Sequence, residues 1–270
     1  MNYRHAYHAG NFADCVKHAL LIELLGAMQR KPKPFLLLDT HAGIGRYDLS
    51  TGPAEKTGEW RGGIARVLAA KPLALATYIA LVERLGLYPG SPAIGAALLR
   101  ATDRLIACEL HPEDAAMLKS GFAGMPNIAV HERDGYEALR AFLPPPEKRA
   151  LVLIDPPFEA ADEFLTLETN LRRAYERFKS GVYVLWYPIK HRAPTRNFGE
   201  SLKLTKLRDV ITVEFLLRPP VDPTRLNGCG LLIVNPPYGF AEAAAPILQA
   251  FVETLGEAGA AYEIERLIDE

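Results

Sequence analysis

The chain has 270 residues, 31 of them basic and 32 acidic, which gives a formal net charge of −1. This length fits one large domain, or one domain with a small insertion, and an apolar share of 49% excludes wholesale disorder. Three distant cysteines exclude a disulfide framework, and no apolar run approaches the roughly 20 residues of a membrane span, so we expect a cytoplasmic protein away from membranes.

Short apolar runs alternate with amphipathic helical segments, a pattern typical of a wound α/β sheet. Five expected strands, separated by helical sequence and therefore parallel, are Phe35–Asp39, Arg104–Glu109, Asn127–Glu132, Ala150–Asp155 and Val182–Tyr187. Two more, Val210–Leu217 and Cys229–Asn235, are joined by a proline-rich segment without helical period. That connection predicts an antiparallel hairpin at the edge of the sheet.

Helical sequence also surrounds the first expected strand. The segment Phe12–Arg30 has a good N-cap in Asn11 and basic residues at its end, as the helix dipole prefers. The interval Arg46–Leu99 is too long for a simple crossover. We therefore expect a catalytic domain formed by 1–49 and 100–270, with a helical insertion at 50–99.

The first strand runs into a glycine loop, Asp39-Thr40-His41-Ala42-Gly43-Ile44-Gly45. Glycines after a strand permit a tight turn and close approach of a nucleotide, although turn-forming glycines are common. Glu109 ends the second strand, where carboxylates typically accept hydrogen bonds from a ribose. Glu109 is far from the glycine loop in sequence. When the expected helical insertion is left out of the count, the separation becomes normal for a carboxylate in this position.

The segment Asp155-Pro156-Pro157-Phe158, directly after the fourth strand, is the clearest chemical signal. An aromatic exocyclic amine is a poor nucleophile because its lone pair is delocalised into the ring. The Asp155 carboxylate and the Pro156 carbonyl can accept both amine hydrogens, which directs the lone pair toward a methyl donor. Phe158 offers a flat face for stacking a flipped base. The alternative is a rigid turn that only ends the strand.

A second match, Asn235-Pro236-Pro237-Tyr238, follows the last expected strand. If the final two strands form a hairpin, this motif lies at the edge opposite the ligand crevice, which sits at the carboxyl ends of the parallel strands. We therefore interpret it as structural.

Several polar residues have two interpretations each. Asp134, with Gly135 after the third strand, either receives the amino group of a nucleoside cofactor or caps the helix 136–143, and the cap is slightly favoured. Lys17 and His18 lie mid-helix, where a solvated face is the simpler interpretation. Nearby histidines lack partners at metal-ligand spacing, so no metal site is expected.

Basic residues are concentrated in 172–208, where ten of them face two acids, a local excess of 8. The net charge gives no whole-molecule argument for nucleic-acid binding. A basic stretch is usually a solvated face, but after Trp186-Tyr187 it also suits contacts with a phosphate backbone.

Taken together, the motifs resemble those of the RlmJ family across essentially the whole chain. The matching segments are Tyr3–Asn11, Ala13-Asp14, Lys17-His18, Leu38–Leu49, Thr57–Val67, Tyr88–Pro92, Glu109–Pro112, Asp134-Gly135, Leu151–Phe158, Leu185–Pro188 and Val234–Pro237. The family departs from this chain at Phe158, where its members often carry tyrosine.

The resemblance implies a class I methyltransferase fold that uses S-adenosylmethionine, with sheet order 3-2-1-4-5-7-6. It implies that Asp155 is catalytic and that the cofactor contacts His18, His41, Ser91, Glu109, Asp134, Gly135 and Asp155. It further places Tyr3 and Lys17 beside the substrate entrance, with Pro156 and Phe158 on the substrate. The tail 3–8 has no regular period, which predicts a mobile lid hinged at Gly10.

The expected reaction is methylation of N6 of one adenine of 23S ribosomal RNA, adenine 2030 in the family, and the expected oligomeric state is a monomer. One alternative is N6-adenine methylation of DNA or of another RNA, because the DPPF chemistry fits any flipped adenine. Another is a non-catalytic RNA-binding protein that retains the cofactor pocket.

Overall fold

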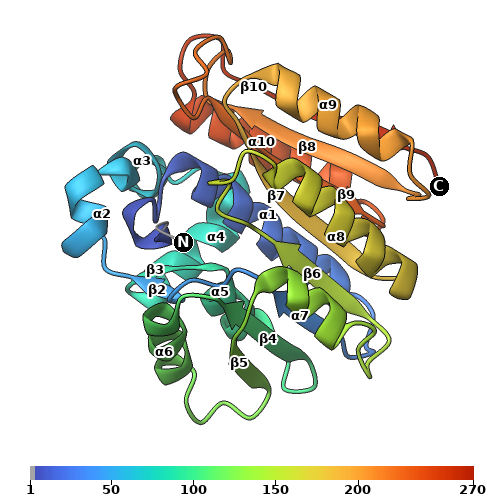
Figure 1. Cartoon of the computed structure of the whole chain (residues 1–270). Helices are drawn as coiled ribbons and strands as arrows, with labels where there is room; N and C mark the ends of the chain where they lie inside the picture. Colours follow the sequence, from blue (N-terminus) through green and yellow to red (C-terminus); the bar gives the residue numbers. More distant parts are fainter. Residues whose placement is uncertain (1–3) are drawn as a thin grey trace.

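The computed structural model describes residues 4–270. In this part of the chain the main sheet contains eight strands: β1 (Leu36–Asp39), β4 (Arg104–Glu109), β5 (Ile128–Glu132), β6 (Ala150–Ile154), β7 (Val182–Ile189), β8 (Val210–Leu216), β9 (Gly228–Val234) and β10 (Ala261–Ile268). They lie in the order β10-β8-β9-β7-β6-β1-β4-β5, and β7, β6, β1, β4 and β5 run parallel (Figure 1). The carboxyl ends of these five strands therefore meet at one edge, called here the carboxyl edge.

The seven expected strands lie in the predicted order, and β8 and β9 pair antiparallel as predicted. The sequence interpretation missed β10, which pairs antiparallel with β8, so the hairpin is not at the edge of the sheet. Residues 261–268 alternate half-buried and exposed side chains along part of their length. Their charged side chains are typical of an edge strand that must not pair with another chain.

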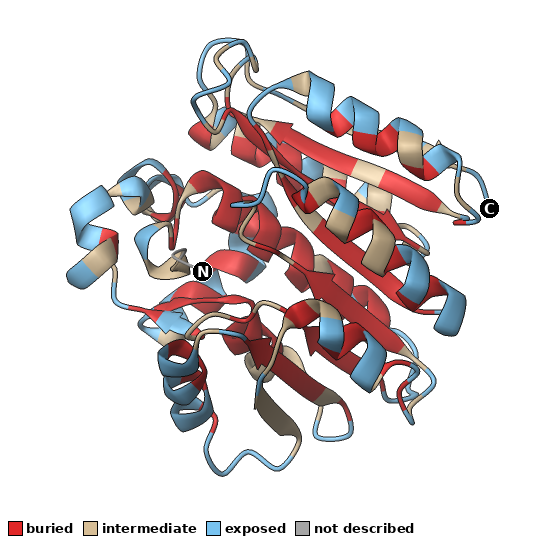
Figure 2. Ribbon diagram, in the orientation of Figure 1, coloured by how far each residue is buried: buried red, intermediate tan, exposed pale blue. Residues whose placement is uncertain are grey.

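Helices cover both faces of the sheet (Figures 1 and 2). One core lies beneath α1 (Phe12–Gln29), α4 (Ala76–Leu85), α5 (Ser91–Leu98), α6 (Pro112–Gly121) and α10 (Phe240–Leu255). The other core lies beneath α7 (Gly135–Phe142), α8 (Glu163–Arg177) and α9 (Arg192–Lys203). Within β1, Leu37 enters the first core while Leu36 and Leu38 enter the second. Burial on both faces explains why the strand is a continuous apolar run.

Helix α1 begins and ends close to where the sequence predicts. The Asn11 side chain accepts a hydrogen bond from the Asp14 backbone N–H at 2.9 Å, which caps the first turn. The proline-containing segment 31–34 follows its last turn. The helix packs against α5 and α10 as well as the sheet, so almost all of its side chains are buried.

The segment between β1 and β4 contains helices α2 (Gly52–Thr57) and α3 (Ile64–Ala70) besides α4 and α5, with short 3-10 turns at Glu59–Gly62 and Leu73–Leu75. Its two ends are joined by a small sheet in which β2 (Arg46–Tyr47) pairs with β3 (Tyr88–Pro89). The Gly90 N–H donates to the Gly45 carbonyl at 2.8 Å, which brings the chain back beside the glycine loop.

Among residues 4–270, no single helix is long and apolar enough to cross a membrane. The helical stretches Glu59–Ala70 and Leu73–Leu85 meet that test only when joined, and they are bent by 110°.

Asn235 has a structural role at the edge opposite the carboxyl edge, as its place after the antiparallel β9 predicts. Its side-chain amide donates to the carbonyl groups of Lys179 and Gly181 at 2.8 and 2.7 Å, and its backbone adopts φ of +54°. The second proline motif therefore ties β9 to the chain that enters β7.

Asn235→Ala should lower the free energy of unfolding by about 1–3 kcal/mol, because two carbonyl groups lose their donor. Urea unfolding followed by circular dichroism measures the change. The matched control is Tyr238→Ala in the same motif, whose side chain is 95% exposed and whose loss should cost less than about 0.5 kcal/mol. Equal stability of the two variants would contradict this role of Asn235.

Candidate active site

A cavity of about 750 Å³ opens at the carboxyl edge, above the ends of β1, β4, β6 and β7. Eight of the residues predicted for the site line it: Lys17, His18, His41, Ser91, Glu109, Asp155, Pro156 and Phe158. Strands from widely separated parts of the chain pair side by side in the sheet, so their ends bring most of the predicted residues to one cavity. Tyr3 lies outside the described residues.

Helix α1 contributes one polar row to this cavity. Asp14, Lys17 and His18 are spaced three and four residues apart, so their side chains lie on one helical face. All three are buried, with exposed fractions of 3%, 4% and 1%. The interpretation of Lys17 and His18 as a solvated face is therefore wrong, because the helix lies inside the protein and its polar row faces the cavity.

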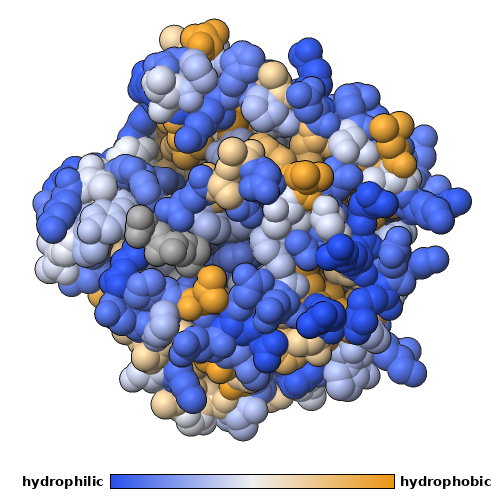
Figure 3. All heavy atoms as spheres, viewed as in Figure 1, coloured by the Kyte–Doolittle hydropathy of each residue, from blue (hydrophilic) through white to orange (hydrophobic). Residues whose placement is uncertain are grey.

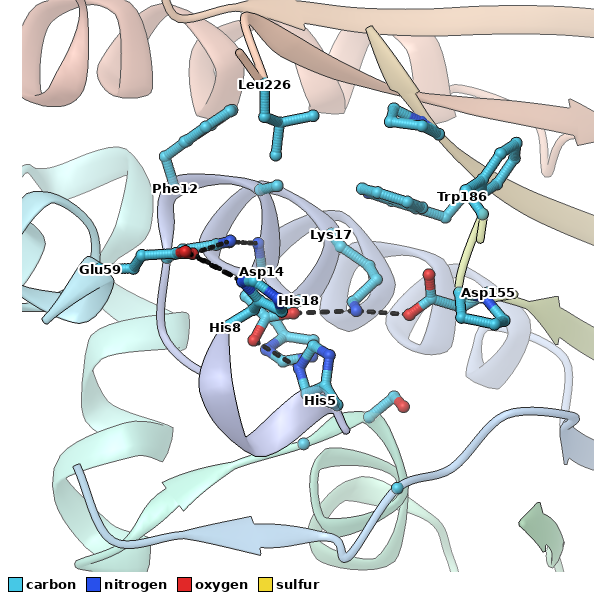
Figure 4. Close-up of a pocket in the computed structure, with 18 of the residues that line it drawn as sticks. His5, His8, Phe12, Asp14, Lys17, His18, Glu59, Asp155, Trp186 and Leu226 are labelled. Atoms are coloured by element: carbon cyan, nitrogen blue, oxygen red, sulfur yellow. Dashed lines mark hydrogen bonds and ion pairs between the residues drawn. The ribbon is translucent and has the colours of Figure 1, made fainter. Parts of the chain in front are cut away.

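Lys17 lies between two carboxylates at the centre of the cavity (Figure 4). Its Nζ is 2.9 Å from Asp14 Oδ1 and 2.5 Å from Asp155 Oδ2. Burial alone would lower the pKa of Lys17, but the charges of Asp14 and Asp155 outweigh it and raise the pKa well above the ordinary value. The ammonium is therefore permanently charged and fixes the carboxylate of Asp155 in place.

Asp14 connects this pair to the start of the chain. Its Oδ2 lies 2.8 Å from His5 Nε2 and accepts the Gly10 backbone N–H at 3.1 Å. Burial opposes the charge of Asp14, but His5 and Lys17 together hold its pKa well below the usual range. Asp14 was not among the predicted site residues, although its three-residue spacing from Lys17 was a usable signal.

The first described residues do not resemble the mobile lid that was expected. His5–Tyr7 forms a 3-10 turn, and Arg4 pairs with Glu113 on α6. His8 lies 3.0 Å from Glu59, and Ala9 and Gly10 are buried. The described part of the tail, residues 4–8, is therefore fixed at the cavity wall through side-chain contacts that its lack of periodicity did not reveal.

Glu109 supports the glycine loop from the end of β4. Its Oε2 accepts the Gly43 N–H and its Oε1 accepts the His111 N–H, both at 2.8 Å. Each oxygen keeps a lone pair for a further donor in the cavity. Ser91, the first residue of α5, lies nearby because the β2–β3 pair returns the chain to this loop.

Two of the cavity histidines, His18 and His41, are uncharged near neutral pH. Burial lowers the pKa of His18 to about 3, against the opposing charge of Asp14, and lowers that of His41 to about 4 against Asp155 and Asp134. Nδ1 of His18 is 3.0 Å from the Tyr88 hydroxyl, which in turn is 3.1 Å from the Tyr78 hydroxyl. This buried chain fixes the orientation of the His18 ring.

Asp134 and Gly135 lie beside the cavity and outside its lining. Asp134 Oδ1 accepts the backbone N–H groups of Tyr136 and Glu137 at 2.9 Å each, so it caps α7. Gly135 packs against His41 so closely that an added Cβ would lie 2.6 Å from the imidazole. The structure supports the capping interpretation, and contact of this pair with a cofactor stays a prediction.

Phe158 belongs to an aromatic cluster on the substrate side of the motif. Its ring centroid is 4.9 Å from that of Phe164 and 5.9 Å from that of Trp186, both edge-to-face. The backbone at Phe158 has φ of +48°, a conformation that costs a non-glycine residue about 1–3 kcal/mol. The cluster thus holds the motif in a shape that the isolated chain would avoid.

Asp39 at the end of β1 was not predicted as a site residue. It is fully buried directly below the loop, and neither carboxyl oxygen has a hydrogen-bond partner among the described residues. Burial raises the pKa of Asp39 to about 7, and the nearby Ser91 hydroxyl only partly offsets this. A ligand that brings a donor or a positive charge above Asp39 would satisfy these oxygens.

Little of the basic segment 172–208 reaches the cavity. Arg177 donates to the carbonyl groups of Arg140 and Leu143, and Arg192 pairs with Glu214. Of the ten basic residues, only Lys190 lines the cavity. The basic residues that do surround it come from other parts of the chain, and the sequence interpretation missed them.

Residues 32–268 match the family model described as "Ribosomal RNA large subunit methyltransferase D, RlmJ". The chain belongs to the RlmJ family. The resemblance found in the motifs is thereby confirmed, and so is the α/β fold of class I methyltransferases.

Relatives in this family cover nearly the whole chain. The "Ribosomal RNA large subunit methyltransferase J" of Haemophilus influenzae is 37% identical over 264 residues, 94% of each chain. The Escherichia coli protein of the same description is 39% identical over 246 residues, 88% of each chain. A crystal structure of a Legionella pneumophila protein superposes with a TM-score of 0.88 at 34% identity, covering 96% of this chain and 98% of that one.

Asp39→Asn should stabilise the ligand-free protein increasingly as the pH rises. The folded pKa of about 7 exceeds the unfolded value of 3.8, so above about pH 4 only the unfolded chain readily releases this proton. The carboxyl therefore costs stability progressively between about pH 4 and pH 7, and the amide does not. Urea unfolding at pH 5, 6.5 and 8 measures the difference.

The control for this series is Asp162→Asn, which changes an exposed carboxyl. Its stability difference from the wild type should not grow over the same range. A constant difference between Asp39→Asn and the wild type at all three pH values would contradict the raised pKa of Asp39.

Proposed function

We propose that this chain transfers the methyl group of S-adenosylmethionine to N6 of one adenine of 23S ribosomal RNA, adenine 2030 in the family. Family membership supports methylation of large-subunit ribosomal RNA. The observation that carries the choice of atom is Asp155, which opens the DPPF motif at the carboxyl end of β6 and faces Lys17 across the cavity (Figure 4). Because the proposed substrate is ribosomal RNA, we infer that the protein acts in the cytoplasm, and a monomer stays a prediction.

The described residues fit S-adenosylmethionine. The buried, unpartnered carboxyl of Asp39, two residues before the lining residue His41, would favour a cationic group in the cavity, and the free lone pairs of Glu109 would accept ribose hydroxyls. Asp14, Lys17 and Asp155 together carry a net charge of −1, and neutral His18 and His41 add no positive charge beside a sulfonium. When bound, this cofactor supplies an electrophilic methyl group.

The acceptor side follows from the motif's geometry. Asp155 Oδ2 is engaged by Lys17, which leaves Oδ1 and the Pro156 carbonyl to accept the two hydrogens of the amine. Phe158 and Trp186 form an aromatic wall next to them, suited to a flipped base. Lys17 acts as a positioning residue, because it fixes the carboxylate and touches no reacting atom in this arrangement.

Asp155→Ala should reduce methyl transfer by at least about 100-fold, since the amine loses an oriented acceptor. The measurement uses unmethylated 23S RNA transcribed in vitro and radiolabelled S-adenosylmethionine, followed by nucleoside mapping of the product. Cofactor affinity should change little. The matched control is Asn235→Ala in the second motif, whose turnover per folded molecule should equal that of the wild type.

The same assay separates the alternatives. N6-methyladenosine formed on 23S RNA supports the proposal, and label found instead in DNA or in another RNA would replace its substrate. RNA binding without any methyl transfer by the wild type would indicate a non-catalytic protein. A folded, inactive Asn235→Ala would overturn the assignment of chemistry to Asp155.

Glu109→Ala should weaken S-adenosylmethionine binding roughly ten- to hundredfold, because hydrogen bonds to a charged group contribute about 1.5–3 kcal/mol. Isothermal titration calorimetry measures the change. The control is Glu132→Ala, an exposed carboxylate paired in register with Glu109 on the neighbouring strand. Unchanged affinity in a folded Glu109→Ala protein would remove Glu109 from the cofactor site.

A further inference from the structure

We propose that four basic side chains around the outer part of the cavity form a preordered binding site for the RNA backbone beside the flipped adenine. This basic rim consists of Arg66, Lys190, Arg218 and Arg225. The inference rests on the proposed function for the identity of the target base, and it assigns RNA contacts to residues outside the methyl-transfer chemistry.

The basic rim is continuous with the reaction site. All four of its residues line the same cavity as Asp155, although they come from α3, the end of β7, the end of β8 and the loop 219–227. Leu226, the residue after Arg225, and Phe12 line the same cavity as the Lys17–Asp155 pair (Figure 4). A base held at Asp155 therefore shares one cavity with these cations, which are available to its own phosphates.

One acid organises the rim without neutralising it. Glu257 accepts two hydrogen bonds from the Arg218 guanidinium, and Arg225 and Arg66 also lie within electrostatic reach of it. With Asp222, which lies near Arg225, four cations face two carboxylates, and this leaves an excess of +2. Arg66 is further fixed by donating to the Leu255 carbonyl at 3.0 Å. The surface around this face of the protein is largely hydrophilic, as an RNA contact requires (Figure 3).

The loop 219–227 is held rigidly in place. The buried amide of Asn227 donates to the carbonyl groups of Lys190 and Asp222 at 2.8 and 2.7 Å, and its backbone N–H donates to Ile189 at 2.9 Å. Arg218 also donates to the Leu226 carbonyl at 3.1 Å. Because the loop is ordered before any ligand binds, RNA does not have to bear the entropic cost of ordering it.

Two members of the rim are available for phosphates. Among residues 4–270, neither Lys190 nor Arg225 forms an ion pair or a side-chain hydrogen bond, and both are exposed. Arg225 lies near Asp222 and Glu257 without pairing with either. These two side chains can therefore meet phosphates without first breaking a contact in the protein.

The test measures binding of unmethylated 23S RNA, transcribed in vitro, by filter retention over a series of KCl concentrations. Lys190→Ala and Arg225→Ala should each raise Kd roughly three- to tenfold and flatten the slope of log K against log salt by about 1. The double variant should combine the two losses. Affinity for S-adenosylmethionine and the melting temperature should equal those of the wild type.

The matched control is Lys179→Ala, which removes one exposed lysine at the opposite edge of the sheet, within the basic segment 172–208. Its RNA affinity and salt slope should be unchanged. If the rim variants bind RNA with the same affinity and salt slope as Lys179→Ala, the proposed role of the basic rim is wrong, even where the wild type methylates RNA. If the wild-type protein binds RNA through the rim but transfers no methyl group, the proposed reaction is wrong and the proposed role of the rim in RNA binding is still supported.

Discussion

The arrangement of the site depends on one ammonium group held between two carboxylates in the protein interior. Lys17 reaches Asp14 on its own helix and Asp155 at the end of β6, so a single side chain joins α1 to the proposed catalytic motif. Breaking such a buried pair from one side typically costs about 3–5 kcal/mol, because the remaining charge is left uncompensated. The N-terminal segment is connected to the same group of charges, because Asp14 also contacts His5 and the backbone N–H of Gly10.

Much of the fold could be predicted from the sequence, because its parallel strands are buried on both faces and are read as unbroken apolar runs. Their parallel direction follows from the helical crossovers, the antiparallel hairpin follows from a proline-rich connection, and the strand order was implied by the family resemblance. β10 was not predicted from the sequence. The charged residues that protect an edge strand from pairing also obscure the alternation of apolar and polar side chains by which a strand is recognised. The small β2–β3 pair has two residues in each strand and leaves no periodic signal.

The candidate site was predictable where its residues follow strands, as Glu109 and Asp155 do. The polar face of α1 was misjudged because amphipathic helices usually turn charge to solvent, and only the packing of α5 and α10 reverses that rule here. Asp39 resembled an ordinary strand end until its two oxygens proved to lack partners among the described residues. The dense basic segment 172–208 was a poor guide to the cavity, because only Lys190 of its ten basic residues lines it.

Charge is instead distributed by distance from the reaction. The centre of the cavity holds a lysine between two carboxylates, next to two uncharged imidazoles, and so carries a slight negative charge that suits a cationic methyl donor. The rim carries the positive charge that a polyanion needs. If the cations lay inside, they would repel the sulfonium, and without them the rim would offer RNA no electrostatic attraction. Under the proposed function, one connected cavity would take two ligands of opposite charge because its two zones have opposite sign.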